Sequence, residues 1–152
     1  MGIEGKVKGR IFLLEDVGVV QRTVYSALEM GGYSVDIHDG EIFMTYEMIN
    51  KYDFSKGVQS KPSEAIFLND YKAAILDIDV KGDSRGGITT LKAIRRDERT
   101  KDMPIIITTR IGERDLVEQI KKLGGVVKYY LKGQKDFSPI GILQTVDDIL
   151  GF

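Results

Sequence analysis

Short apolar runs alternate along this chain with longer segments that have helical spacing. Apolar runs that stop at a polar residue are typical of strands buried on both faces, and they cover residues 11–14, 73–76, 104–107 and 126–131. Residues 33–38 alternate between apolar and polar positions and add one more strand. Segments with apolar residues three or four positions apart follow the strands, at residues 20–28, 63–68, 88–94, 116–123 and 139–150. Five successive strand–helix units predict an α/β fold, in which helices cover both faces of a parallel sheet.

Two stretches do not fit this alternation. Residues 1–9 contain three glycines and alternating charges, and we interpret them as a flexible leader. Residues 41–62 lie between the second strand and the second helix. The apolar positions of an extra helix expected there are Ile42, Tyr46 and Ile49. We therefore divide the chain into a leader, 1–9, and one domain, 10–152, with an insertion at 41–62.

Composition limits the available chemistry. The chain of 152 residues has the length of one domain, and it contains no Cys and a single His, His38. A disulfide framework, a thiolate zinc site and a cysteine nucleophile are therefore excluded, and we expect His38 to be a loop residue at a strand end rather than a metal ligand. With 22 basic and 23 acidic residues, there is no basic surplus for direct nucleic-acid binding. The longest apolar runs have four residues, and no signal peptide is evident, so we expect a cytoplasmic protein without membrane contact.

Polar residues follow the predicted strands at the points where each strand ends. Glu15 and Asp16 follow the first strand, Asp77 the third, Thr109 the fourth and Lys132 the fifth. In open α/β sheets, ligands bind beyond the carboxyl ends of the strands, so these side chains should meet at one edge. Clustered carboxylates repel one another, and a hard divalent cation such as Mg²⁺ removes that conflict. With a Lys and a Thr nearby, the edge suits a phosphoryl group, and a carboxylate is a candidate nucleophile.

The ordered set of residues at these strand ends resembles the receiver domain of bacterial and archaeal response regulators, over about residues 10–150. The resemblance implies a flavodoxin-like, doubly wound (βα)5 sandwich whose five parallel strands have the order 2-1-3-4-5, with the insertion placed between strand 2 and helix 2. It also implies that a sensor histidine kinase donates a phosphoryl group to Asp77. Asp16, Asp77 and the backbone carbonyl of Asp79 would ligate Mg²⁺, and Glu15 would act on the metal. Such a protein is not a conventional enzyme, because it catalyses only its own phosphorylation and dephosphorylation.

The resemblance assigns three further residues to the phosphorylated state. Lys132 would hold the phosphoryl oxygens, Thr109 would bind the attached group, and Tyr129 would move inward as the aromatic reporter of the switch. Thr108 competes with Thr109, since adjacent strand residues point to opposite faces and at most one of them faces the site. Thr109 is preferred because it lies five residues after Pro104, as in the family pattern.

Several positions depart from that pattern. Glu15 replaces the commoner Asp, Gly133 stands where Pro is usual, and Arg110 stands where a small residue is usual. Asp79 places an extra negative charge near the path of a water molecule that attacks the phosphoaspartate. We hypothesise that Asp79 and Arg110 modulate the lifetime of the phosphoryl group; the alternative is that both are solvated loop charges.

Two other functions also fit part of this pattern. The segment from Asp77 to Asp79 also resembles the first motif of haloacid-dehalogenase-type phosphatases, but in those enzymes the acidic pair comes last, whereas Glu15 and Asp16 come first here. The second alternative is a receiver-like binding module that does not use phosphorylation.

The expected output is contact with another protein. No further domain follows the last predicted helix, so we expect a stand-alone receiver that binds a downstream effector through about residues 113–150, with a homodimer as a further option. For the insertion 41–62 we expect an extra helix beside the active-site edge, either as a partner or dimer contact or as a cover packed on its own domain.

Overall fold

The computed structural model describes residues 7–78, 86–109, 114–131 and 138–152. Within these ranges the strands form one seven-stranded sheet in the order β4-β3-β2-β1-β5-β6-β7. The strands are β1 (Gly9–Leu14), β2 (Tyr33–His38), β3 (Ile42–Met44), β4 (Val58–Gln59), β5 (Ala73–Asp77), β6 (Ile105–Thr109) and β7 (Val126–Leu131). No helix among the described residues has both the length and the apolar composition needed to cross a bilayer.

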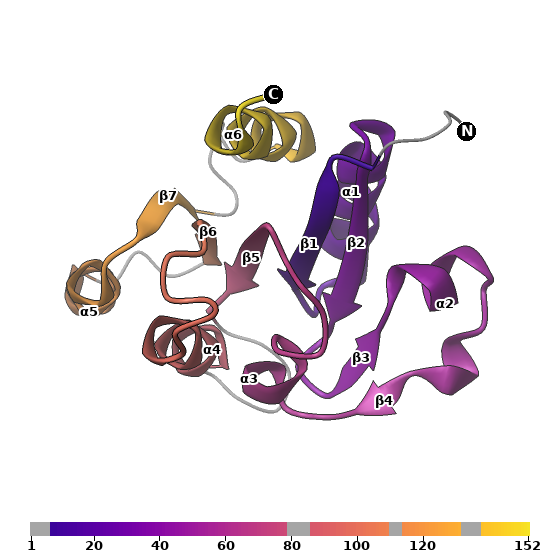
Figure 1. Ribbon diagram of the computed structural model, residues 1–152, viewed down its shortest axis with the longest axis horizontal. Helices are drawn as coiled ribbons and strands as arrows, with labels where there is room; N and C mark the ends of the chain where they lie inside the picture. Colours follow the sequence, from indigo (N-terminus) through magenta and orange to yellow (C-terminus); the bar gives the residue numbers. More distant parts are fainter. Residues whose placement is uncertain (1–6, 79–85, 110–113, 132–137) are drawn as a thin grey trace.

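The five predicted parallel strands have the predicted order. β2, β1, β5, β6 and β7 pair in parallel, which is the order 2-1-3-4-5 of a flavodoxin-like sheet. The prediction of a five-stranded sheet is corrected, because the insertion adds β3 and β4 as antiparallel strands beyond β2. Figure 1 shows these two strands and α2 as an arm at the lower right of the molecule.

Helices cover both faces of the parallel strands (Figure 1). The helices are α1 (Gly18–Met30), α2 (Tyr46–Asn50), α3 (Pro62–Ala65), α4 (Gly86–Arg96), α5 (Arg114–Leu123) and α6 (Pro139–Leu150), with a 3-10 turn, η1 (Phe54–Lys56). α1 and α6 pack on one face through Val24, Leu28, Ile142 and Val146. α3, α4 and α5 pack on the other through Ile66, Leu91, Ile94 and Ile120.

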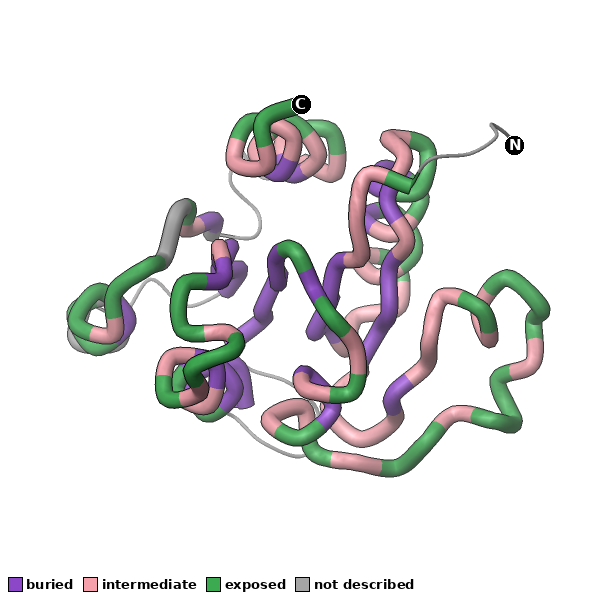
Figure 2. Tube along the Cα trace, in the orientation of Figure 1, coloured by how far each residue is buried: buried purple, intermediate pink, exposed green. Residues whose placement is uncertain are grey.

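The central strands have few exposed residues, as Figure 2 shows, and their side chains divide between the two faces. Ile11 and Leu13 of β1 belong to the core beneath α1 and α6, whereas Phe12 and Leu14 belong to the core beneath α3, α4 and α5. Burial on both faces is the physical reason that these strands are continuous apolar runs.

The insertion does not form the expected helix from Ile42 onward. Phe43 is buried while its neighbours Ile42 and Met44 are partly exposed, which is the alternation of a strand. The helix begins only after Thr45, whose hydroxyl accepts a hydrogen bond from the Met48 N–H at 3.3 Å. The spacing of Ile42, Tyr46 and Ile49 fits a helical period, but the first of them belongs to β3.

The last residues of the predicted leader join the fold. Gly9 begins β1, and the backbone N–H of Lys8 donates to the Gly32 carbonyl at 2.8 Å. The Lys8 ammonium also pairs with Asp147 of α6 at 3.3 Å.

Candidate functional site

Three acidic side chains meet at the carboxyl edge of the sheet, as the strand-end pattern predicts. β1 and β5 are parallel neighbours with Leu14 opposite Leu76, so Glu15, Asp16 and Asp77 follow at the same level. One carboxylate oxygen from each of the three lies within 4.8 Å of the others. Glu15 and Asp77 are buried and Asp16 is partly exposed, so the cluster has one side open to solvent.

Backbone contacts fix the position of Glu15. Its N–H donates to the carbonyl of His38 at 3.0 Å, and its carboxylate accepts from the Val17 N–H at 3.1 Å. The side-chain amide of Gln21 donates to the Glu15 carbonyl. These contacts join β1, β2 and the start of α1 at the point where the acidic cluster lies.

The donor set fits a divalent cation. Mg²⁺ takes oxygen ligands at about 2.0–2.1 Å in an octahedron, so opposite ligands lie about 4.2 Å apart. An upper separation of 4.8 Å between the three oxygens is close to this value. Two of the three carboxylates are almost without solvent exposure, so a bound cation would reduce their mutual repulsion more than solvent does.

Gly87 lies directly behind Asp77. Its N–H donates to the Ile78 carbonyl at 3.1 Å, and a Cβ at this position would lie 2.3 Å from the backbone oxygen of Asp77. The first turn of α4 can approach the strand end only because this residue has no side chain. The closeness of the two backbones depends on the packing of α4.

The two threonines at the end of β6 lie on opposite faces. Thr108 is opposite Asp77 in the β5–β6 register, whereas Thr109 alternates with it and follows the face of Ile105 and Ile107. Tyr129 packs against the same core as those two isoleucines. Both threonines are buried, and Thr109 shares its face of the sheet with Tyr129.

Three predicted site residues, Asp79, Arg110 and Lys132, lie outside the described residues, as does Gly133. β7 ends at Leu131, the residue before Lys132 in the sequence.

His38 corrects one expectation. It is the last residue of β2 and is fully buried, not a loop residue. Its Nδ1 accepts from the Gly40 N–H at 2.9 Å, which leaves Nε2 to donate to the Ser60 carbonyl at 3.0 Å. Burial lowers the pKa of the imidazole. The neutral ring thus connects β2 to the end of the insertion.

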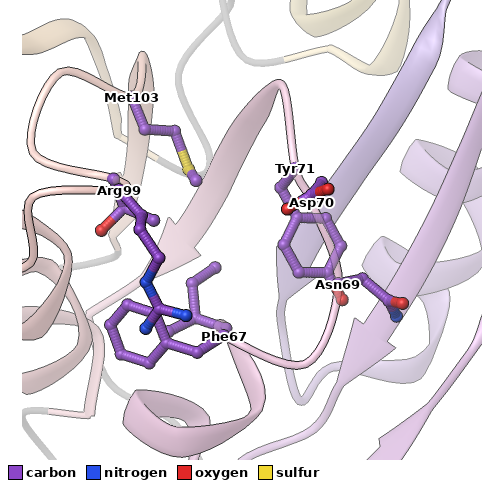
Figure 3. Close-up of a pocket in the computed structure, with 8 residues that line it drawn as sticks. Phe67, Asn69, Asp70, Tyr71, Arg99 and Met103 are labelled. Carbon is purple, nitrogen blue, oxygen red and sulfur yellow. The ribbon is translucent and has the colours of Figure 1, made fainter.

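A small cavity of about 220 Å³ lies at the opposite edge of the sheet (Figure 3). Tyr71 and Met103, which line it, precede β5 and β6, so the cavity is at the amino ends of these strands. Arg99 lies over the ring of Phe67 at 5.2 Å and also pairs with Asp97 at 2.8 Å. Its guanidinium is therefore already engaged, and we assign no chemistry to this cavity.

No family model and no curated protein matches the sequence. Solved structures do match nearly the whole chain. The receiver domain of a sensor histidine kinase from Pseudomonas aeruginosa, with a magnesium ion coordinated in its active-site cleft, has a TM-score of 0.67 at 19% identity, covering 95% of this chain and 98% of that one.

Two further structures agree. A CheY-like receiver domain protein from Methanospirillum hungatei has a TM-score of 0.68 at 18% identity, covering 96% of this chain and 95% of that one. The phosphorylated cyanobacterial phytochrome response regulator RcpA has a TM-score of 0.64 at 19% identity, covering 93% of each chain. The resemblance read from the sequence is thus confirmed for the fold: this chain has the CheY-like fold of response regulator receiver domains.

Proposed function

We propose that this protein is a response regulator receiver that accepts a phosphoryl group on Asp77 in a Mg²⁺-dependent reaction. The observation that supports this function best is the cluster of Glu15, Asp16 and Asp77 at the carboxyl edge of a receiver fold. Charged oxygen ligands at this edge are what a phosphoryl-accepting carboxylate and its metal require.

The chemistry is a transfer between two nucleophiles. A carboxylate oxygen of Asp77 forms a bond to phosphorus while the bond from phosphorus to the donor's imidazole nitrogen breaks. Glu15, Asp16 and Asp77, with the backbone carbonyl of Asp79, would hold Mg²⁺, which supplies positive charge to the phosphoryl oxygens when bound. Lys132 adds a second positive charge and Thr109 a hydroxyl donor.

The phosphoryl donor in this proposal is a sensor histidine kinase, and the output is contact with a downstream protein through about residues 113–150. Two of the similar structures support the chemistry, since one holds magnesium in its active-site cleft and another is phosphorylated. Phosphorylation would act through Thr109 and Tyr129, which share one face of the sheet.

The test is incubation with acetyl phosphate and Mg²⁺, followed by intact-mass measurement. We expect a mass increase of one phosphoryl group in the wild-type chain and in the exposed control variant Asp102→Asn. We expect no adduct in Asp77→Asn or in the presence of EDTA. An adduct that survives in Asp77→Asn would contradict the assignment.

The same measurement separates the alternative functions. A wild-type chain that stays unmodified while binding a partner would be a phosphorylation-independent module. Steady release of phosphate from many equivalents of a phosphate ester would instead indicate a phosphatase.

A further inference from the structure

An apolar groove of about 510 Å³ lies between α1 and the insertion 41–62. It exists because β3 extends the sheet beyond the strands that α1 covers. Phe43 of β3 points to the buried core under α3, and its neighbours Ile42 and Met44 therefore face the opposite side. There they line the groove together with Phe54 of η1.

The walls of the groove are held in place by contacts between α1 and α2. The Tyr25 hydroxyl donates to the Asn50 side-chain oxygen at 2.8 Å, and the rings of Tyr25 and Tyr46 lie 6.4 Å apart. At the other end, the Asp39 carboxylate accepts from the N–H groups of Glu41 and Ile42 at 2.8 and 2.7 Å. The groove is therefore a preformed feature rather than a gap between loose segments.

The groove opens at the same edge as the acidic cluster. Gln21, which lines it, donates to the Glu15 carbonyl. Asp39, which also lines it, follows His38, and the carbonyl of His38 accepts from the Glu15 N–H. A protein that brings a reactive side chain to Asp77 along this edge can therefore also reach the groove.

The chemistry of the groove defines what would fill it. Its floor is apolar, and Phe54 on the rim is 52% exposed, an arrangement that favours an apolar anchor from a partner. The exposed guanidinium of Arg22 also lines it, and within the described ranges the structure records no ion pair for this residue. An acidic side chain beside the apolar anchor would complement it.

We propose that this groove docks the protein that donates the phosphoryl group, through an apolar side chain next to an acidic one, so that the insertion contributes to the choice of donor. This inference rests on the proposed function. A donor fits better than an effector, because the expected effector surface includes β7, at the other end of the sheet from β3. The groove, by contrast, adjoins the acceptor itself.

The experiment compares two donors on the full chain. One is acetyl phosphate, and the other is an autophosphorylated sensor histidine kinase selected because it transfers to the wild-type chain. In Phe54→Asp and Arg22→Gln, we expect transfer from the kinase to slow by about tenfold, the size of a hot-spot loss. Labelling by acetyl phosphate should stay within about twofold of wild type, which also shows that the variants fold.

Matched controls come from the same part of the molecule. Tyr52→Asp repeats the aromatic-to-acid change on an 83% exposed residue of the insertion that does not line the groove, and its positive φ of 56° is tolerated by Asp. Lys51→Gln repeats the loss of one positive charge on an exposed residue outside the lining. Both should accept phosphoryl groups from either donor at wild-type rates.

Each other outcome overturns the inference in a recognisable way. Wild-type rates from the kinase in Phe54→Asp and Arg22→Gln would show that the donor does not use the groove. If these variants instead change only the dimerisation of the chain in sedimentation, the occupant is a second copy. If acetyl phosphate does not label even the wild-type chain, the proposed function fails, and the docking role fails with it.

Discussion

At the scale of single residues, the clearest case is His38, the one histidine in the chain. Its ring lies against Phe12 and Phe43, with centroids 6.4 and 6.2 Å away, and its two nitrogens bind Gly40 and Ser60. Burial lowers the pKa of the imidazole, although the Ser60 carbonyl and the Asp39 carboxylate act in the opposite direction. Protonation of Nδ1 would also remove the acceptor that the Gly40 N–H uses.

This burial predicts a pH-dependent stability. As pH falls through the ordinary value of 6.5, the unfolded chain binds a proton that folded His38 does not, so the free energy of unfolding decreases down to the lower pKa of the folded state. Urea unfolding at about pH 7.5 and about pH 5.5 measures this loss. We expect a smaller loss in His38→Asn, which keeps an acceptor for Gly40. An equal loss in both proteins would contradict the neutral, buried imidazole.

The positions of the acidic residues in the sequence are sufficient to predict that they meet, whereas the position of His38 does not predict its contacts. Glu15, Asp16 and Asp77 were predicted to meet because parallel strands end at one edge, and the structure brings them together. The surroundings of His38 depend on Ser60, which is 22 residues away, and no local pattern indicates that contact. The same holds for Gly87, whose role depends on where α4 packs.

At the scale of elements, the insertion is attached to the domain through the buried carboxylate of Asp36 on β2. This carboxylate accepts from the Tyr46 N–H at 2.8 Å, which lies at the start of α2. It also accepts from the Tyr71 hydroxyl at 2.6 Å and the Asn69 amide at 2.9 Å, both from the segment before β5. Arg10 of β1, at 3.6 Å, supplies the opposite charge. One side chain thus joins four segments of the chain.

We expect Asp36→Asn to lower the free energy of unfolding by about 3 kcal/mol, because the amide lacks the negative charge and one of the two acceptor oxygens, so that buried donors lose their partner. Chemical denaturation measures this difference. Asp53→Asn is the control within the insertion, since Asp53 pairs with Lys56 at 3.5 Å on the surface and the Lys56 side chain is 73% exposed. Loss of that pair should cost less than about 1 kcal/mol. Similar losses in the two variants would mean that the Asp36 network contributes little.

The element that sequence reasoning described least well is the insertion itself. Its expected helix is a strand followed by a short helix, because Phe43 finds a buried site next to Phe12, with ring centroids 6.3 Å apart. Because β3 is only three residues long, the spacing of its apolar residues cannot distinguish a strand from the start of a helix.

At the scale of the whole molecule, the acidic cluster links metal binding to stability. Asp77 ends β5, and Glu15 and Asp16 follow the neighbouring strand β1, so the repulsion between the carboxylates acts only in the folded chain, where β1 and β5 are paired. A cation that binds this cluster binds the folded state selectively and stabilises it.

We therefore expect Mg²⁺ to raise the unfolding temperature of the wild-type chain, by a free energy of about 2.7 kcal/mol at a concentration one hundred times its Kd. Mg²⁺ should stabilise the Asp16→Asn variant much less than the wild-type chain. Without Mg²⁺, the variant should be at least as stable as wild type, because one of the repelling charges has been removed. Calorimetry with NaCl at equal ionic strength controls for screening. Equal gains in Mg²⁺ and NaCl would contradict a metal site.

Burial on one or both faces imposes a short repeat along the chain, so the five parallel strands, the helices between them and the polar residues at the strand ends could be predicted from the sequence. What those residues contact depends on how the elements pack in three dimensions. The placement of β3 and β4 beside β2, the burial of His38 and Asp36, and the groove beside α1 all depend on partners far apart in the sequence. A polar side chain can be buried only where such partners satisfy its hydrogen bonds, and a local repeat contains no information about them.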